Sequence, residues 1–152
     1  MNIIKYFQEV RRDGKIIEEN MSVQDLIDEG WGVEQVTTLR WEVEGKKKEL
    51  HNSAGILAEV LSDRSAVVGI FTQGGNDILK VINPDGTERL TISNNQLLNG
   101  DIVKGVFEWF EPASCNSGPC FGVIFKSDST GNIYQLDIDA ISGQVISERR
   151  NM

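Results

Sequence analysis

Histidine, cysteine and proline are scarce in this chain of 152 residues, which has one, two and three of them respectively. A nucleophilic triad would have to use the single histidine, His51, and the G-x-S-x-G motif that presents a catalytic serine is missing. A structural zinc site needs four ligands, and the cysteines and the histidine form no recognisable ligand motif. We therefore expect no catalytic residue, no metal and no cofactor.

Two other motifs are present only in part. Gly74-Gly75 lacks the spacing of a phosphate-binding loop. The segment Asp137–Glu148 begins like a calcium-binding EF-hand loop, but Ser142 holds the sixth position, where the sharp turn needs glycine. Ile141 holds the fifth position, which should supply a ligand. We expect a hairpin here and no calcium site.

Long apolar runs are also missing. No stretch approaches the roughly 20 apolar residues that span a bilayer, and the N-terminal residues have no apolar core of the kind found in signal peptides. Two cysteines in a chain of this length fit a reducing compartment. We expect a cytoplasmic protein that does not associate with membranes.

Cys115 and Cys120 bracket a run of turn residues, Asn116 to Pro119. Their C-x4-C spacing differs from the C-x-x-C spacing of thioredoxin-like redox pairs. Ordinary thiols in a loop are the favoured interpretation, and a disulfide across the loop is the main alternative. The loop joins two apolar segments, VFEWF and FGVIF, which we expect to be strands near the centre of a sheet.

The net charge of −8 is concentrated in one segment. Between Ile16 and Glu44 the only basic residue is Arg40, so this segment carries −7 of the total. An acidic field of this kind repels nucleic acid and attracts basic proteins, and we expect no nucleic-acid binding. The acidic residues of the segment are Glu18, Glu19, Asp25, Asp28, Glu29, Glu34, Glu42 and Glu44.

Short apolar segments separated by turn residues dominate the rest of the pattern, which is typical of β-hairpins. The segment Ser53–Leu61 also contains fair helix formers, but a hairpin is favoured because it leads directly into another apolar run. The expected turns lie at Asp13-Gly14, Gly45, Ser62–Ser65, Pro84–Gly86, Thr130-Gly131 and Ser142-Gly143.

One helix is predicted after the first hairpin. Ser22 and Asp25 have the spacing of a capping box, Val23, Leu26 and Ile27 form an apolar stripe, and Gly30 can end the helix. No linker divides the chain. We therefore predict a single domain, residues 1–152, of the mostly β (α+β) class, with an antiparallel sheet or sandwich built of hairpins and one or two short helices.

Tryptophan is the residue that best marks a candidate binding surface. Trp31 lies between two glycines in the acidic segment, whereas Trp41 and Trp109 lie within apolar strand patterns and are expected in the core. The residues expected to bind a partner are Glu18, Glu19, Asp25, Asp28, Glu29, Trp31 and Glu34.

Two resemblances extend this interpretation. The segment YQLDIDAISGQVIS, Tyr134 to Ser147, resembles the last hairpin of PepSY-type domains, but the helix that precedes it in such domains is not evident here, so their inhibitor function is not carried over. The profile of the whole chain, which is small, acidic and poor in catalytic motifs, resembles the immunity proteins of bacterial contact-dependent growth inhibition and related polymorphic toxin systems.

The second resemblance implies a protein that binds and neutralises a cognate toxin domain without catalysing a reaction. The acidic segment makes a basic toxin the expected partner, and a basic nuclease the expected class. The alternative hypothesis is a non-catalytic, β-rich structural or ligand-binding module of a bacterial or phage assembly.

Overall fold

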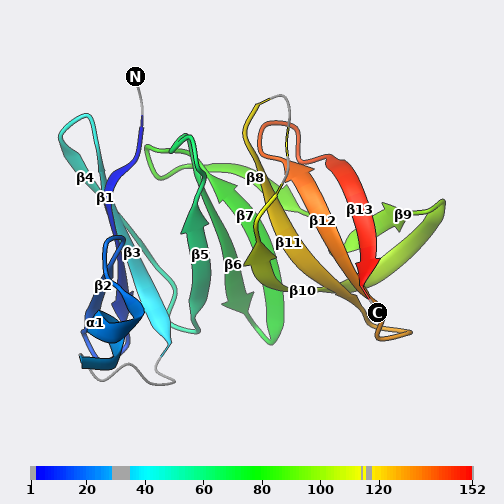
Figure 1. Cartoon of the computed structure of the whole chain (residues 1–152), viewed down its shortest axis with the longest axis horizontal. Coiled ribbons are helices and arrows are strands. Elements are labelled where there is room, and N and C mark those ends of the chain that lie inside the picture. Colours follow the sequence, from blue (N-terminus) through cyan, green and yellow to red (C-terminus); the bar gives the residue numbers. More distant parts are fainter. Residues whose placement is uncertain (1–2, 29–34, 114, 116–117, 152) are drawn as a thin grey trace.

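The computed structural model describes residues 3–28, 35–113, 115 and 118–151. In this part of the chain, antiparallel strands form three sheets and there is one short helix (Figure 1). Each sheet is made of strands that follow one another in the sequence, and the three sheets lie side by side along the long axis of the molecule (Figure 1). The predicted mostly β class, built of hairpins, is confirmed.

The first sheet has the strand order β2-β1-β3-β4. The helix α1, Val23–Asp28, lies between β2 and β3 in the sequence. The predicted turns at Asp13-Gly14 and Gly45 join β1 to β2 and β3 to β4. The strands are β1 (Lys5–Arg11), β2 (Ile16–Glu18), β3 (Val36–Val43) and β4 (Lys46–His51).

The second sheet has the order β5-β6-β7-β8. The hairpin predicted for the ambiguous segment after Ser53 is confirmed, because the amide of Leu61 donates to the carbonyl of Ala66 across its turn at 3.0 Å. The strands are β5 (Ile56–Val60), β6 (Val67–Gln73), β7 (Asn76–Ile82) and β8 (Glu88–Ile92).

The third sheet has the order β13-β12-β11-β10-β9, so β11 is its central strand, as predicted. In its last turn, the carboxylate of Asp139 accepts the amides of Ile141 and Ser142 at 2.7 and 2.9 Å. The strands are β9 (Asn95–Leu98), β10 (Asp101–Glu111), β11 (Cys120–Ser127), β12 (Ile133–Asp139) and β13 (Val145–Asn151).

The middle position of the second sheet explains the apolar run in β6. Val68 and Ile70 belong to the core shared with the third sheet, while Val67 and Phe71 belong to the core shared with the first sheet. Successive side chains of a strand point to opposite faces, so a strand that is covered on both faces must be apolar throughout. This buried strand fixes the order of the layers.

Arg89 on β8 adds a polar connection between the second and third sheets. Its guanidinium donates to the Asn83 side chain at 2.6 Å, to the carbonyl of Ser65 in the β5–β6 turn at 3.0 Å, and to the carbonyl of Ala140 after β12 at 3.2 Å.

In the part of the chain that is described, no helix has the length and apolar character needed to cross a bilayer.

Candidate protein-binding surface

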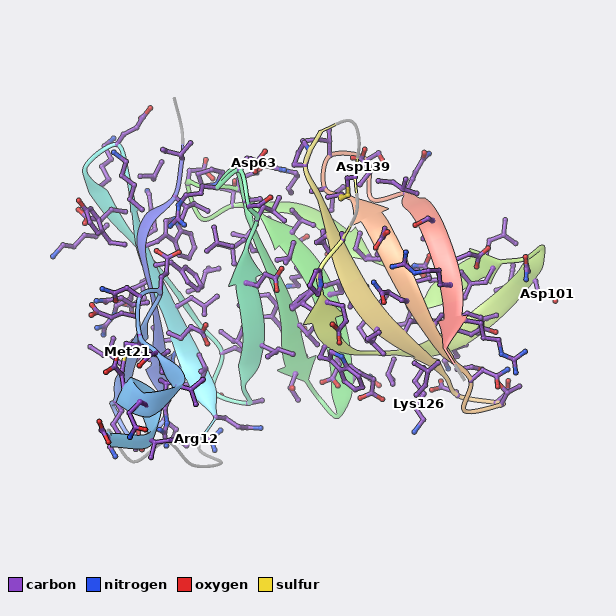
Figure 2. All side chains as sticks on the ribbon, viewed as in Figure 1. Arg12, Met21, Asp63, Asp101, Lys126 and Asp139 are labelled. Atoms are coloured by element: carbon purple, nitrogen blue, oxygen red, sulfur yellow. A yellow bond between two sulfur atoms is a disulfide. The ribbon has the colours of Figure 1, made fainter. Side chains whose placement is uncertain are left out.

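The predicted partner-binding residues that the structure describes gather at one end of the molecule, on β2, the following turn and α1 (Figure 1). We call the segment from Ile16 to Asp28 the β2–α1 corner. Figure 2 shows Met21 of this corner and Asp101 at opposite ends of the long axis. Glu29, Trp31 and Glu34, and the helix-ending Gly30, lie outside the described residues. An open hollow of 660 Å³ in this region is lined by Gly14, Ile16, Glu18, Met21, Asp25 and Asp28.

A capping box positions the acidic side chains of α1, as predicted. The amide of Ser22 donates to the Asp25 carboxylate at 3.0 Å, and the amide of Asp25 donates to the Ser22 hydroxyl at 3.1 Å. One turn later the Gln24 side chain donates to Asp28 at 2.9 Å. These local hydrogen bonds hold both carboxylates at the surface of the helix.

Two of the three apolar side chains of α1 face solvent, and Leu26 is half-buried. Val23 is 67% exposed and Ile27 57%, Ile16 on β2 is also exposed, and no residue of the helix is buried. An amphipathic helix normally packs its stripe on the core of its own domain. An unpacked stripe beside carboxylates has the composition of a protein interface, with an apolar centre and a polar rim.

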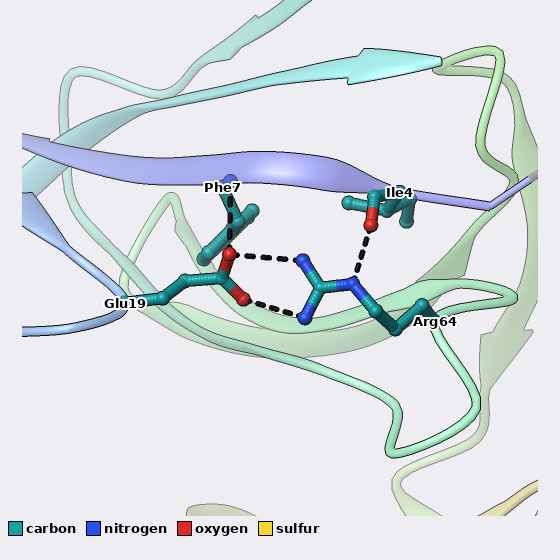
Figure 3. Close-up of polar contacts among 4 residues, drawn as sticks. All are labelled: Ile4, Phe7, Glu19 and Arg64. Carbon is teal, nitrogen blue, oxygen red and sulfur yellow. Dashed lines mark hydrogen bonds and ion pairs between the residues drawn. The ribbon is translucent and has the colours of Figure 1, made fainter. Parts of the chain in front are cut away.

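Glu19 plays a different part from the other predicted acids (Figure 3). The guanidinium of Arg64, in the β5–β6 turn, contacts both oxygens of the Glu19 carboxylate, at 2.8 and 2.9 Å. The same carboxylate accepts the amide of Phe7 at 3.2 Å. The Arg64 guanidinium also donates to the carbonyl of Ile4. In turn, the backbone carbonyl of Arg64 accepts the amide of Ile4 at 2.9 Å. Glu19 therefore attaches the corner to the second sheet.

The single histidine of the sequence lies at the surface of the first sheet. Nδ1 of His51, at the end of β4, lies 2.8 Å from the hydroxyl of Thr38 on β3, and the imidazole is exposed. Within the described ranges, no group of three or more histidine, cysteine, aspartate or glutamate side chains could hold a metal ion.

The favoured interpretation of the two cysteines is wrong, because Cys115 and Cys120 are joined by a disulfide. Their Cα atoms lie 6.3 Å apart, within the range that a disulfide spans. Cys120 begins β11, and the carbonyl of Pro119 accepts the amide of Ala140 at 3.0 Å. The bond thus closes the loop between β10 and β11.

The two tryptophans that were predicted in the core differ in their burial. Trp41 is buried, and its indole N–H donates to the carbonyl of Pro84 at 2.7 Å. The prediction for Trp109 is wrong, since 45% of this residue is exposed.

A β-bulge in β10 is the reason for this exposure. Phe107 is paired with Phe125 but Trp109 with Ile124, so β10 contains one residue more than its partner at this point. The extra residue reverses the alternation of faces. Trp109 points away from the core, and Phe110 packs against Phe121 inside it.

The exposed indole contacts one carboxylate, which in turn acts on a carboxylate of β5. The indole N–H of Trp109 donates to Glu111 at 2.7 Å. The pKa of Glu59 on β5 is raised, mainly because the carboxyl group is partly buried and to a smaller extent because Glu111 is negatively charged. Leu57 on β5 and Glu108 line a hollow of 310 Å³, together with other residues that include Glu9 and Asp77. We call Leu57, Glu59, Glu108, Trp109 and Glu111 the Trp109 surface. No pattern in the sequence indicates this surface, because it combines residues of β5 and β10, which are far apart along the chain.

Comparison with known proteins gives one informative match. No protein-family model matches the chain, and its sequence has no significant match among curated proteins. Among solved structures, it is similar to a chain of a two-protein assembly, "Structure of Tne2 in complex with Tni2", with a TM-score of 0.91 and 29% sequence identity. The match covers 99% of this chain and 100% of the other. This likeness supports the resemblance to immunity proteins of toxin systems.

Proposed function

We propose that the protein is an immunity protein that binds and neutralises a cognate toxin domain of basic character, a nuclease being the class that fits best. The observation that carries the proposal is the match over nearly the whole length to a chain of the Tne2–Tni2 complex. The acidic β2–α1 corner supplies the argument for a basic partner, and the sequence motifs give no support for catalysis. The cytoplasm is the proposed location, where the disulfide between Cys115 and Cys120 would be reduced.

Electrostatics gives the corner its proposed role. A nuclease binds the phosphates of its substrate through cationic side chains. Glu18, Asp25 and Asp28 present negative charge around exposed apolar side chains, so they would attract such a surface over a distance and then cover it. Toxin that is covered in this way cannot bind its substrate.

The experiment uses the protein encoded by the neighbouring gene as the toxin candidate, with association measured by stopped flow at several salt concentrations. We expect complex formation and an on-rate that falls as salt rises. The double variant E18Q/D28N should lower the on-rate at low salt by about threefold or more. The matched control is D101N/D128N, which removes two exposed charges from the third sheet and its β11–β12 turn. Equal effects of the two variants, or an on-rate independent of salt, would count against the corner.

One observation favours the alternative of an assembly module. Leu97 and Ile102 face each other across the β9–β10 hairpin and are 67% and 77% exposed. Aliphatic side chains this exposed are typical of surfaces that pack against another chain. Light scattering of the purified protein tests this alternative. A stable oligomer that L97D/I102D converts to a monomer would favour it.

A further inference from the structure

We propose that the Trp109 surface is a second docking surface, which receives an arginine- or lysine-bearing segment of a protein partner. It goes beyond the proposed function, because it involves other strands than the β2–α1 corner. Three features of the surface support this role: a fixed indole, exposed apolar groups, and carboxylates without an ion-pair partner among the described residues.

The indole of Trp109 is held in its exposed position. The bulge turns it to the outer face of the third sheet, where it is paired with the buried Ile124, and Glu111 accepts its N–H at 2.7 Å. A large, rigid side chain loses little conformational freedom when it binds, which is why exposed tryptophan is favoured at the centre of interfaces.

Apolar area and negative charge meet on this surface. Leu57 and Trp109 are each 45% exposed. Leu57 and Glu108 line one hollow, and the charge of Glu111 acts on Glu59, so β5 and the end of β10 contribute to the same region. The region thus combines exposed apolar groups and carboxylates from two strands.

The carboxylates of this surface form no ion pair within the described part of the chain. Among the residues that the structure describes, no lysine or arginine forms an ion pair with Glu59, Glu108 or Glu111. The mutual repulsion and partial burial that raise the pKa of Glu59 would both be offset by a bound cation. The surface therefore favours a positively charged occupant.

The chemistry favours a guanidinium or ammonium group carried by a protein segment. Such a group can lie over the indole ring while it pairs with a carboxylate, and its alkyl stem can cover Leu57. A bare metal ion would gain nothing from the tryptophan and the leucine. An anionic membrane or a nucleic acid would be repelled by the carboxylates.

A nuclear magnetic resonance titration of the full chain with the peptide acetyl-tetra-arginine amide tests the proposal. The indole N–H resonance of Trp109 is identified by its loss in W109F. We expect this resonance to shift saturably as peptide is added. The variant E59Q/E108Q, which keeps the Glu111 hydrogen bond to the indole, should raise the Kd by about fivefold. The matched control D101N/D128N, which removes two exposed charges from β10 and the β11–β12 turn, should leave the Kd unchanged.

Two outcomes would overturn the proposal. One is a peptide that shifts only resonances of the β2–α1 corner and leaves the Trp109 indole unmoved. The other is a Kd that E59Q/E108Q does not change. The toxin candidate takes no part in this titration, so failure to bind the toxin would count against the proposed function alone.

Discussion

Substitution of Glu9 by glutamine should stabilise the protein at alkaline pH. Glu9 on β1 is paired with the buried Leu39, and it lines the 310 Å³ hollow with apolar residues such as Ile56 and Ile70 of the second sheet. Burial raises its pKa from 4.5 to about 7. A carboxylate at this interface is therefore more costly when charged than when protonated.

The sign and size of the effect follow from the two pKa values. Because the pKa of Glu9 is higher in the folded state than in the unfolded state, the stabilisation from its protonated form is fully present below pH 4.5. It is lost as the pH rises through about 7. At about 1.36 kcal/mol per pKa unit, the difference between a pKa of 4.5 and one of about 7 corresponds to about 3 kcal/mol in the free energy of unfolding.

Urea denaturation of the wild-type protein and of E9Q between pH 5 and pH 8 measures this effect. The neutral amide resembles the protonated acid, so the two proteins should differ least at pH 5. At pH 8, E9Q should be more stable by about 2–3 kcal/mol. The control D101N, at the far end of the molecule, should follow the wild-type pH dependence. Parallel curves for wild type and E9Q would refute the burial argument.

Three further variants probe the contacts between and within the sheets. Replacing Glu19 with glutamine should lower the free energy of unfolding by about 1 kcal/mol, since its ion pair is partly exposed, and a double-mutant cycle with R64K should show coupling. Under oxidising conditions, C115S/C120S should cost about 2 kcal/mol, as expected for such a short loop, and the difference should vanish with reductant. Gly122→Ala would place a Cβ 2.5 Å from a backbone oxygen of β10, so we expect a loss of about 2 kcal/mol or more in thermal or chemical denaturation. A fully stable alanine variant would show that the strands adjust without cost.

Local features of the fold were predictable from the sequence because local chemistry determines them. The turns at Asp13-Gly14 and Pro84–Gly86 are set by residues that adopt turn conformations readily. The capping box needs only Ser22 and Asp25. The hairpins, the helix start and the central place of β11 could therefore be derived without knowledge of the tertiary structure.

Features that depend on pairing between strands were not predictable in this way. Nothing in VFEWF marks the bulge that exposes Trp109, because the extra residue is defined only against β11. The exposed stripe of α1 looked like any core-facing stripe. Glu19 was predicted to bind a partner protein. Its ion pair with Arg64 could not be foreseen, because the two residues lie 45 positions apart in the sequence. The Trp109 surface likewise exists only after β5 and β10 have met.

The β5–β6 turn takes part in contacts toward both neighbouring layers. Arg64 of this turn contacts Ile4, just before β1, and Glu19, just after β2. The carbonyl of Ser65 accepts a hydrogen bond from Arg89 of β8, which also donates to the carbonyl of Ala140 after β12. An inserted peptide tag at this turn would separate both sets of contacts at once. The exposed glycine pair 74–75 between β6 and β7 has no such neighbours among the described residues. It is the better position for an epitope or a fluorescent reporter.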